Sequence, residues 1–347
     1  MTHAMAGGGE YDRNSDPQRQ DAASLLDLVV DAADGVVPDP GRGAVVLVDY
    51  GCAQGRSSTP LLRAAIERIR AHRPEVPIAV VHEDVLDNDW AGLYEGLRGE
   101  GSYLDVPGGP ILPMTSASSF YEPVVPPGLV DLGVSFAALQ WLARPGPGGT
   151  GSALFFDQLV GADATAMADQ AHTDWTRFLQ LRADELVLGG RLVVDMMGRH
   201  DGGASTGGHL WAQVRSVAEA LIAEGSLDAA RVDGYVFPVY ERTLAEVRRP
   251  FDEALGDRFE LEHLELRDSE TPAWQRYEAD GDADAFARSF VGFVRAFSEP
   301  SLRAALDPDG AALDELYRRL GQRAAADPSA FAFTVHVLSA VIVRTGS

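Results

Sequence analysis

The chain has 347 residues, of which 46% are hydrophobic, enough for a large core in one domain or two smaller ones. Its formal net charge of −23 at pH 7 argues against nucleic acid and anionic membrane surfaces as partners. Cys52 is the single cysteine, which excludes an intrachain disulfide and a thiolate metal cluster.

The first twenty residues are polar and rich in glycine, without the apolar stretch of a signal peptide. No run in the sequence approaches the roughly 18 to 20 apolar residues of a membrane span. We therefore expect a soluble, cytoplasmic protein whose residues 1–20 form an irregular polar arm. A helix is predicted to follow the arm over 21–33.

The sequence pattern centres on residues 44–55. A run of β-branched and apolar residues predicts a buried strand that ends at Asp49. Gly51 and Gly55 then predict a turn in which a ligand could approach the backbone without meeting a Cβ. A helix predicted over 59–70 completes the front half of a βαβ unit, whose ligand site lies at the carboxyl ends of the strands.

The next predicted strand, 77–82, is followed by Glu83-Asp84, and a carboxylate there can accept hydrogen bonds from both hydroxyls of a ribose. The turn reads D-x-G-x-x-x-G, unlike the G-x-G-x-x-G of dinucleotide sites that hold a pyrophosphate. Asp49 would repel a phosphate but suit a cationic amino-acid group. The pattern therefore favours S-adenosylmethionine over NAD. A dinucleotide enzyme and an ordinary strand–turn–helix unit are the alternatives.

Further along the chain, strands and helices alternate before the pattern becomes mainly helical. The remaining predicted elements are a helix up to 97, a loop at 106–113, strands at 129–136 and 191–196, a long helix over 163–188 that ends at Gly189-Gly190, a helix over 210–223, an edge strand at 259–266, helices over 283–299 and 312–325, and a final strand at 331–343. The predicted class is α/β with a Rossmann-like sheet. The predicted divisions are an arm (1–20), a cofactor-binding α/β core (21–200), a mainly helical cap with the edge strand (201–328), and a final strand that returns to the core sheet (329–347).

Several motifs occur together in an order that is typical of one family. They are Tyr11-x-x-Asn14-Ser15-x-x-Gln18, Glu83-Asp84-Val85-Leu86-Asp87-Asn88-Asp89-Trp90, Ser118-Ser119-Phe120-Tyr121, Ala138-Leu139-Gln140-Trp141-Leu142, and the segment from Phe178 to Arg191. With them the chain resembles, over nearly its whole length, a bacterial-type member of the SABATH methyltransferases. This family uses S-adenosylmethionine to methylate carboxylic acids and, in some members, xanthine nitrogens.

The resemblance implies a homodimeric enzyme that converts S-adenosyl-L-methionine to S-adenosyl-L-homocysteine. Its fold would be a Rossmann-like methyltransferase sheet with a mostly helical cap, and the arm would close the active site. There Gln18 and Trp141 would bind the carboxylate of a small-molecule acid. The residues implied to bind the cofactor are Tyr11, Ser15, Asp49, Gly51, Asp84, Val85, Ser119 and Phe120, and the turn pattern adds Gly55.

Such a reaction needs no proton transfer by the enzyme. A carboxylic acid with a pKa near about 4 is already ionised at pH 7, so no general base is needed and rates should be nearly flat above about pH 6. The enzyme has to align oxygen, methyl carbon and sulfur and to exclude water. Neutral donors such as Gln18 and Trp141 suit this task. An Arg would lose much of its interaction with the carboxylate as the charge disappears in the transition state, which would raise the barrier.

Two departures from the family pattern concern the acceptor. Ala137 stands four residues before Trp141, where the family commonly has Tyr, and Gln140 stands where His or Met is usual. The small Ala137 side chain predicts an enlarged apolar pocket, with Phe136, Leu139, Val236, Phe237, Phe290 and Phe293 as candidate lining residues. We therefore expect a hydrophobic monocarboxylate, either a medium-chain fatty acid or an aryl acid. A small aromatic acid such as salicylate or benzoate, or a nitrogen or phenol acceptor, is the alternative.

Other classes of function receive less support from the sequence. The chain lacks the third glycine of the dinucleotide fingerprint, which argues against an NAD(P)-linked oxidoreductase. A non-catalytic cofactor-binding protein is the other alternative, and it would bind cofactor without methyl transfer. No G-x-S-x-G motif indicates a hydrolase. His200, Asp201 and His209 lie in a Gly-rich stretch without helical ligand spacing, so no metal site is expected.

Overall fold

A computed structural model of the chain describes residues 25–37, 41–146, 153–203, 205–307 and 310–346. The predicted arm lies outside these ranges, and with it Tyr11, Ser15 and Gln18. Among the described residues, none of the helices is both long enough and apolar enough to cross a bilayer.

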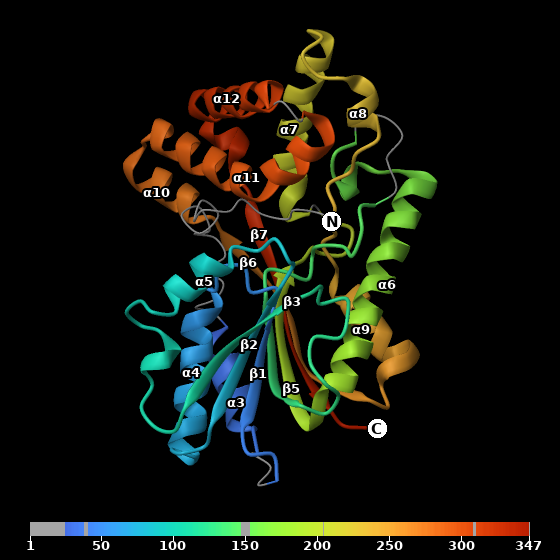
Figure 1. The fold of residues 1–347 in the computed structure, drawn as a ribbon. Helices are drawn as coiled ribbons and strands as arrows, with labels where there is room; N and C mark the ends of the chain where they lie inside the picture. The colour runs from blue at the N-terminus through green and yellow to red at the C-terminus, as the bar shows by residue number, and fades with distance from the viewer. Residues whose placement is uncertain (1–24, 38–40, 147–152, 204, 308–309, 347) are drawn as a thin grey trace.

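The described residues form a seven-stranded sheet in the order β3-β2-β1-β4-β5-β7-β6 (Figure 1). The strands are β1 (Val45–Tyr50), β2 (Ile78–Asp84), β3 (Ile111–Ala117), β4 (Val130–Phe136), β5 (Leu186–Met197), β6 (Phe259–Glu270) and β7 (Thr334–Arg344). Neighbouring strands among β1 to β5 pair in parallel, whereas β7 is antiparallel to both β5 and β6. All six residues of β1 are buried, as expected for an apolar run covered on both faces.

Helices cover both faces of the sheet (Figure 1). The helices α3 (Leu26–Asp34), α4 (Ser58–His72) and α5 (Trp90–Gly96) lie on one side, and α6 (Gly161–Glu185) and α9 (Leu244–Pro250) lie on the other. Residues such as Leu62 and Ile66 of α4 pack in one core cluster, and Trp175 and Phe178 of α6 pack in a second. The period of apolar residues therefore places each helix on its face.

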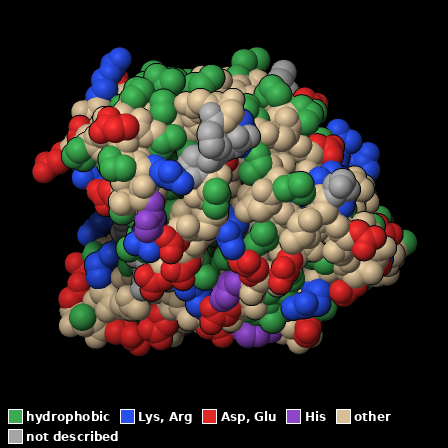
Figure 2. Space-filling view, turned by 90° about the horizontal axis from the view of Figure 1, so that it is seen from below, with side chains coloured by type: hydrophobic (Ala, Val, Ile, Leu, Met, Phe, Trp, Pro, Cys, Tyr) green, Lys and Arg blue, Asp and Glu red, His purple; other side chains and the backbone are tan. Residues whose placement is uncertain are grey.

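A third core cluster belongs to the helices above the carboxyl ends of the parallel strands. These are α7 (Thr206–Ala223), α8 (Ala229–Asp233), α10 (Pro272–Asp280), α11 (Ala283–Leu306) and α12 (Ala311–Ala326). On the opposite side of the molecule, acidic side chains spread over the surface with Arg and His between them (Figure 2). The predicted α/β class with a mostly helical cap is confirmed.

Two local predictions were wrong. The loop predicted over 106–113 runs into β3, an edge strand that tolerates Pro113 because one side of the strand has no partner in the sheet. The long helix ends at Glu185 and β5 starts at once, although the sequence predicted helix up to 188. There, residues 187–190 bulge out of the pairing with β4 and Gly189 has a φ of 77°, so the glycines lie within the strand rather than after the helix.

Candidate active site

The turn after β1 is tied to the end of β2. The backbone N–H groups of Gly51 and Cys52 both donate to the carbonyl of Glu83 at 2.9 Å. Gly51 has a φ of 74°, and a Cβ placed on it would lie 2.4 Å from the Cβ of Ala138. Only glycine therefore fits this position without displacing the chain that follows β4.

Asp84 ends β2 and is held by the same turn. Its Oδ2 accepts a hydrogen bond from the backbone N–H of Ala53 at 2.7 Å, and its Oδ1 accepts from that of Val85 at 2.8 Å. Burial raises the pKa of Asp84 to about 6, although these two hydrogen bonds act in the opposite direction. The carboxylate is thus fixed in orientation and retains lone pairs for a ligand.

Asp84 opens onto a cavity that we call the turn cavity. Its lining consists of Gly51, Asp84, Val85, Leu86, Asp87, Ser119, Phe120, Tyr121, Ala138, Trp141, Leu142, Ala143, Arg144 and Pro145. Five of the predicted cofactor residues are therefore brought together, namely Gly51, Asp84, Val85, Ser119 and Phe120. The carboxylate can accept from two hydroxyls, and Gly51 contributes backbone alone to the lining.

Asp49 and Gly55 do not line the turn cavity. Asp49 is 1% exposed, and its Oδ2 lies 2.6 Å from Ser58 Oγ and 3.0 Å from His82 Nδ1. The other His82 nitrogen lies 2.9 Å from the Tyr103 hydroxyl. Because side chains alternate along a strand, Asp49 points toward the face covered by α4 and supports the turn from beneath. The geometry gives no support to a contact between Asp49 and a cationic ligand group.

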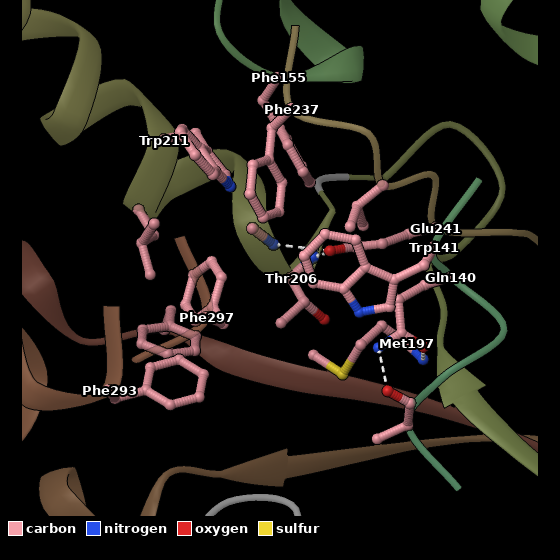
Figure 3. A pocket seen from close by; sticks show the side chains of 15 residues that line it. Gln140, Trp141, Phe155, Met197, Thr206, Trp211, Phe237, Glu241, Phe293 and Phe297 are labelled. Carbon is pink, nitrogen blue, oxygen red and sulfur yellow. Dashed lines mark hydrogen bonds between the residues drawn. The ribbon is translucent and has the colours of Figure 1, made fainter. Parts of the chain in front are cut away.

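A second cavity, which we call the aromatic pocket, lies between the sheet and the cap (Figure 3). Its lining consists of Ala137, Gln140, Trp141, Phe155, Met197, Thr206, Gly207, Leu210, Trp211, Phe237, Val239, Glu241, Phe293, Phe297 and Phe333. All four described residues predicted to contact the substrate, Ala137, Gln140, Trp141 and Phe237, are among them. Trp141 lines both cavities, so the two share it as part of their walls.

The Trp141 side chain is positioned from several directions. Its backbone carbonyl accepts a hydrogen bond from the Tyr121 hydroxyl at 2.7 Å, and its backbone pairs with Val239. Its ring packs on Phe237 with centroids 5.1 Å apart and planes at 60°. No group within the described part of the chain accepts a hydrogen bond from its indole N–H, which remains available to a ligand.

Gln140 has a different environment. Its Nε2 donates to the carbonyl of Ala137 at 2.6 Å, and its Oε1 is 3.5 Å from the backbone nitrogen of Met197. The amide therefore links the turn after β4 to the end of β5 and fixes the pocket wall. Ala137 itself has a φ of 50°, a left-handed conformation that a non-glycine residue seldom adopts.

Glu241 is the one ionisable residue that lines the aromatic pocket among those the structure describes. Its two oxygens accept from the backbone N–H groups of Thr206 at 2.6 Å and Gly207 at 3.0 Å, at the start of α7. Burial raises the pKa of Glu241 to about 8, against the effect of these hydrogen bonds. The surroundings therefore disfavour the charged form of this side chain, as expected for a carboxyl among apolar groups.

Sequence reasoning identified only part of this pocket. Phe237 and Phe293 line it as expected, but Leu139, Val236 and Phe290 are buried in the core and Phe136 packs against the core cluster that includes α4. The missed aromatic residues are Phe155, Trp211, Phe297 and Phe333. Phe297 could have been found, because it follows Phe293 by one helical turn on α11. The others come from distant segments and carry no local signal.

With this geometry, comparison with known proteins decides the family. The family model for SAM-dependent carboxyl methyltransferases matches residues 1–344. The chain belongs to this family. The match confirms the resemblance seen in the motifs, and S-adenosylmethionine is the cofactor.

Relatives of this methyltransferase agree with the assignment. Methyltransferase LUC1 from a Fusarium species is 29% identical over 300 residues, which cover 84% of this chain and 79% of that protein. Gibberellic acid methyltransferase 1 from Arabidopsis thaliana is 26% identical over 310 residues, which cover 81% of this chain and 80% of that protein. A solved structure of loganic acid methyltransferase with SAH shares the fold, with a TM-score of 0.80 at 19% identity over 99% of both chains.

The residues of the turn cavity fit S-adenosylmethionine. Asp84 supplies a fixed acceptor of the kind that binds ribose hydroxyls, and Gly51 lines the cavity at a position where no Cβ fits. Phe120 adds an aromatic surface, and Ser119 and Val85 lie beside it in the lining. These five described residues are the ones that would hold the cofactor.

Proposed function

We propose that this enzyme forms the methyl ester of a hydrophobic monocarboxylic acid, either a medium-chain fatty acid or an aryl acid. One observation carries the proposal: the mainly aromatic pocket and the turn cavity share Trp141 as a lining residue. An acid whose apolar body filled this pocket would present its carboxylate at the junction. Relatives named for gibberellic acid and loganic acid support an acid as the acceptor.

The proposed mechanism needs orientation more than acid–base chemistry. When bound, S-adenosylmethionine supplies a sulfonium methyl group that a carboxylate oxygen can attack. The indole N–H of Trp141 would donate to the other carboxylate oxygen, and Gln18, from the arm outside the described residues, would donate an amide N–H. Aromatic side chains exclude water, which favours a step in which an anion and a cation lose their charges.

The small side chain of Ala137 supports a large acceptor. Ala137 and Trp141 line the same pocket, so an aromatic ring in place of the Ala137 methyl group would occupy space beside the carboxylate. Each additional CH₂ that finds apolar surface should contribute about 0.8 kcal/mol, or roughly fourfold in kcat/KM, until the pocket is full.

The deciding experiment measures methyl transfer from labelled S-adenosylmethionine to acids from butanoate to dodecanoate, beside benzoate and salicylate. The proposal predicts a steep rise in kcat/KM with chain length, and Ala137→Tyr should shorten the preferred chain while leaving S-adenosylhomocysteine affinity unchanged. A flat series with salicylate preferred would contradict the enlarged pocket. Xanthines and phenols in the panel test for a nitrogen or phenol acceptor, and binding of cofactor without any transfer would indicate a non-catalytic protein.

The quaternary state and compartment are part of the proposal. We expect a homodimer, as the family resemblance implies, and we propose a cytoplasmic location. Light scattering behind a sizing column should then give twice the 37.1 kDa mass of one chain. Removing residues 1–20, which we propose close the active site, should reduce methyl transfer more than it reduces cofactor binding, because Gln18 leaves with them.

A further inference from the structure

Three side chains of types that can bind a metal, from two neighbouring strands and the turn after a third, meet at the surface of the molecule. His200 follows β5, Asp268 lies in β6 and His336 lies in β7, and their ligand atoms all lie within 4.8 Å of one another. We call them the His–Asp–His cluster. Asp268 follows His200 by 68 positions, and His336 follows Asp268 by another 68, so no local motif in the sequence pointed to them.

The cluster has the geometry of an open ligand set. Asp268 Oδ1 lies 2.8 Å from both His200 Nε2 and His336 Nδ1, and the two imidazole rings are 5.0 Å apart at 84°. The side chains of His200 and Asp268 are 50% exposed, and that of His336 is 13% exposed. Three protein ligands thus converge from one side, and the other side is open to water.

The backbone holds the three residues rigidly. Asp268 and His336 are directly paired in the β6–β7 ladder. The backbone N–H of His336 donates to Thr206 Oγ1 at 2.8 Å, and its carbonyl accepts from Gly198 at 2.8 Å, two residues before His200. Ligands carried on a sheet in this way are positioned before a metal arrives, which reduces the cost of binding.

We propose that the His–Asp–His cluster binds one divalent transition metal, Zn²⁺ in the first instance. Two imidazole nitrogens and one carboxylate oxygen are ligands that suit zinc, whereas Mg²⁺ and Ca²⁺ prefer sites made of oxygen alone. A water molecule would complete the four-coordinate shell. The metal would join β6, the edge strand of the sheet, to β7 and to the turn after β5, and so stabilise the wall next to the aromatic pocket.

Calorimetric titration of the full chain with Zn²⁺ tests the proposal. We expect one zinc ion per chain, a Tm that rises with zinc, and no comparable heat with Mg²⁺. His336→Ala and Asp268→Asn should each weaken zinc binding by at least about tenfold, because even the loss of an outer partner typically costs about 10- to 100-fold. His200→Ala removes a half-exposed ligand outside the strands, so the test survives if a strand variant fails to fold.

The chain offers a matched control in His72, an exposed histidine whose Nε2 lies 2.9 Å from Asp34. The second partner of Asp34 is Arg68, which cannot bind a metal as a second histidine would. His72→Ala should bind zinc like the wild type. If the wild type takes up no zinc, or if His200→Ala and His336→Ala bind it as tightly as His72→Ala does, the cluster is an ordinary set of ion pairs and the proposal is overturned.

Discussion

Asp84 is a carboxylate whose orientation is set by two backbone N–H groups, so its loss should act on the cofactor more than on the fold. We predict that Asp84→Ala weakens binding of S-adenosylhomocysteine by about 1 to 3 kcal/mol, the cost of leaving ribose hydroxyls unpaired in a buried site. Calorimetric titration measures the change. Asp84→Asn keeps one acceptor oxygen, so its affinity should lie between those of the wild type and Asp84→Ala. An unchanged dissociation constant would remove Asp84 from the site.

Trp141 lines both cavities and its indole N–H has no acceptor among the described residues, so its replacement should separate catalysis from cofactor binding. We predict that Trp141→Phe, which keeps the packing on Phe237, lowers methyl transfer to acids by roughly tenfold or more, as expected for one lost hydrogen bond to a charged group. Gln18→Ala should have a similar effect. Initial rates and S-adenosylhomocysteine titrations on the same samples check both, and a loss of cofactor affinity equal to the loss of rate would argue against this role.

The raised pKa of Glu241 predicts an alkaline limit for the proposed reaction, whereas the sequence alone predicted rates nearly flat above about pH 6. Its pKa of about 8 means that it ionises above neutral pH and would then repel a substrate carboxylate in the aromatic pocket. On the acid side, protonation of Asp84 near pH 6 removes an acceptor for the cofactor. We predict a plateau of kcat/KM between about pH 6 and about pH 8, with a fall above it that Glu241→Gln abolishes.

The same residue links pH to stability. Because the pKa of Glu241 is raised above its ordinary 4.5, its contribution to stability is complete below that pH and is lost as the pH rises through about 8. Melting curves of wild type and Glu241→Gln should therefore diverge between these values.

A methyl-transfer rate that keeps rising toward pH 9, with chemistry limiting, would contradict the predicted plateau and indicate a phenol or amine acceptor.

At the scale of elements, the turn between β1 and α4 depends on Gly51 for two separate reasons, its positive φ and the closeness of Ala138. Gly43 has a similar φ of 68°, but a Cβ added there would have nothing within 4 Å, so it is a matched control. We predict that Gly43→Ala costs about 1 to 2 kcal/mol of stability from backbone strain alone. Gly51→Ala should cost more and should also weaken cofactor binding. Chemical denaturation and titration of both variants measure the two effects.

Most elements followed from local patterns, and the failures have physical causes. β1, β2, β4 and β7 are largely buried strands rich in apolar residues, and the period of α4 matched its buried face. β3 was missed because an edge strand with one exposed face carries a weak apolar signal and admits proline. The short helices α9 and α10 were also missed, although Thr243 and Thr271 cap them in the usual way.

At the scale of the whole molecule, both cavities draw on segments that only the tertiary fold brings together. The turn cavity was largely predictable, because its residues follow the ends of parallel strands and occur in recognisable motifs. The aromatic pocket was not, because its wall combines Phe155 from a loop, Trp211 from α7, Phe297 from α11 and Phe333 from the chain before β7. Packing between distant helices decides which of many apolar residues face a cavity, and periodicity does not distinguish them.

The net charge of −23 acts on every ligand that approaches the molecule. The turn cavity adds Asp84 and Asp87 to this field, with Arg144 as its one positively charged lining residue among those described. A negative cavity in a negative molecule attracts cations over a distance set by the ionic strength. S-adenosylmethionine is a net cation at neutral pH, from its sulfonium and ammonium groups, whereas S-adenosylhomocysteine is a zwitterion without net charge, so the two form a natural comparison.

We predict that association of S-adenosylmethionine slows by at least about twofold when salt rises from about 0.01 M to about 0.1 M, because the Debye length falls from about 30 Å to about 10 Å. Association of S-adenosylhomocysteine should change little over the same range. Stopped-flow fluorescence can follow both, since Trp141 lines the turn cavity. Equal salt dependence for the two ligands would mean that the field at the cavity is locally cancelled, and Arg144→Ala, which removes a positive charge from the lining, should then restore the difference.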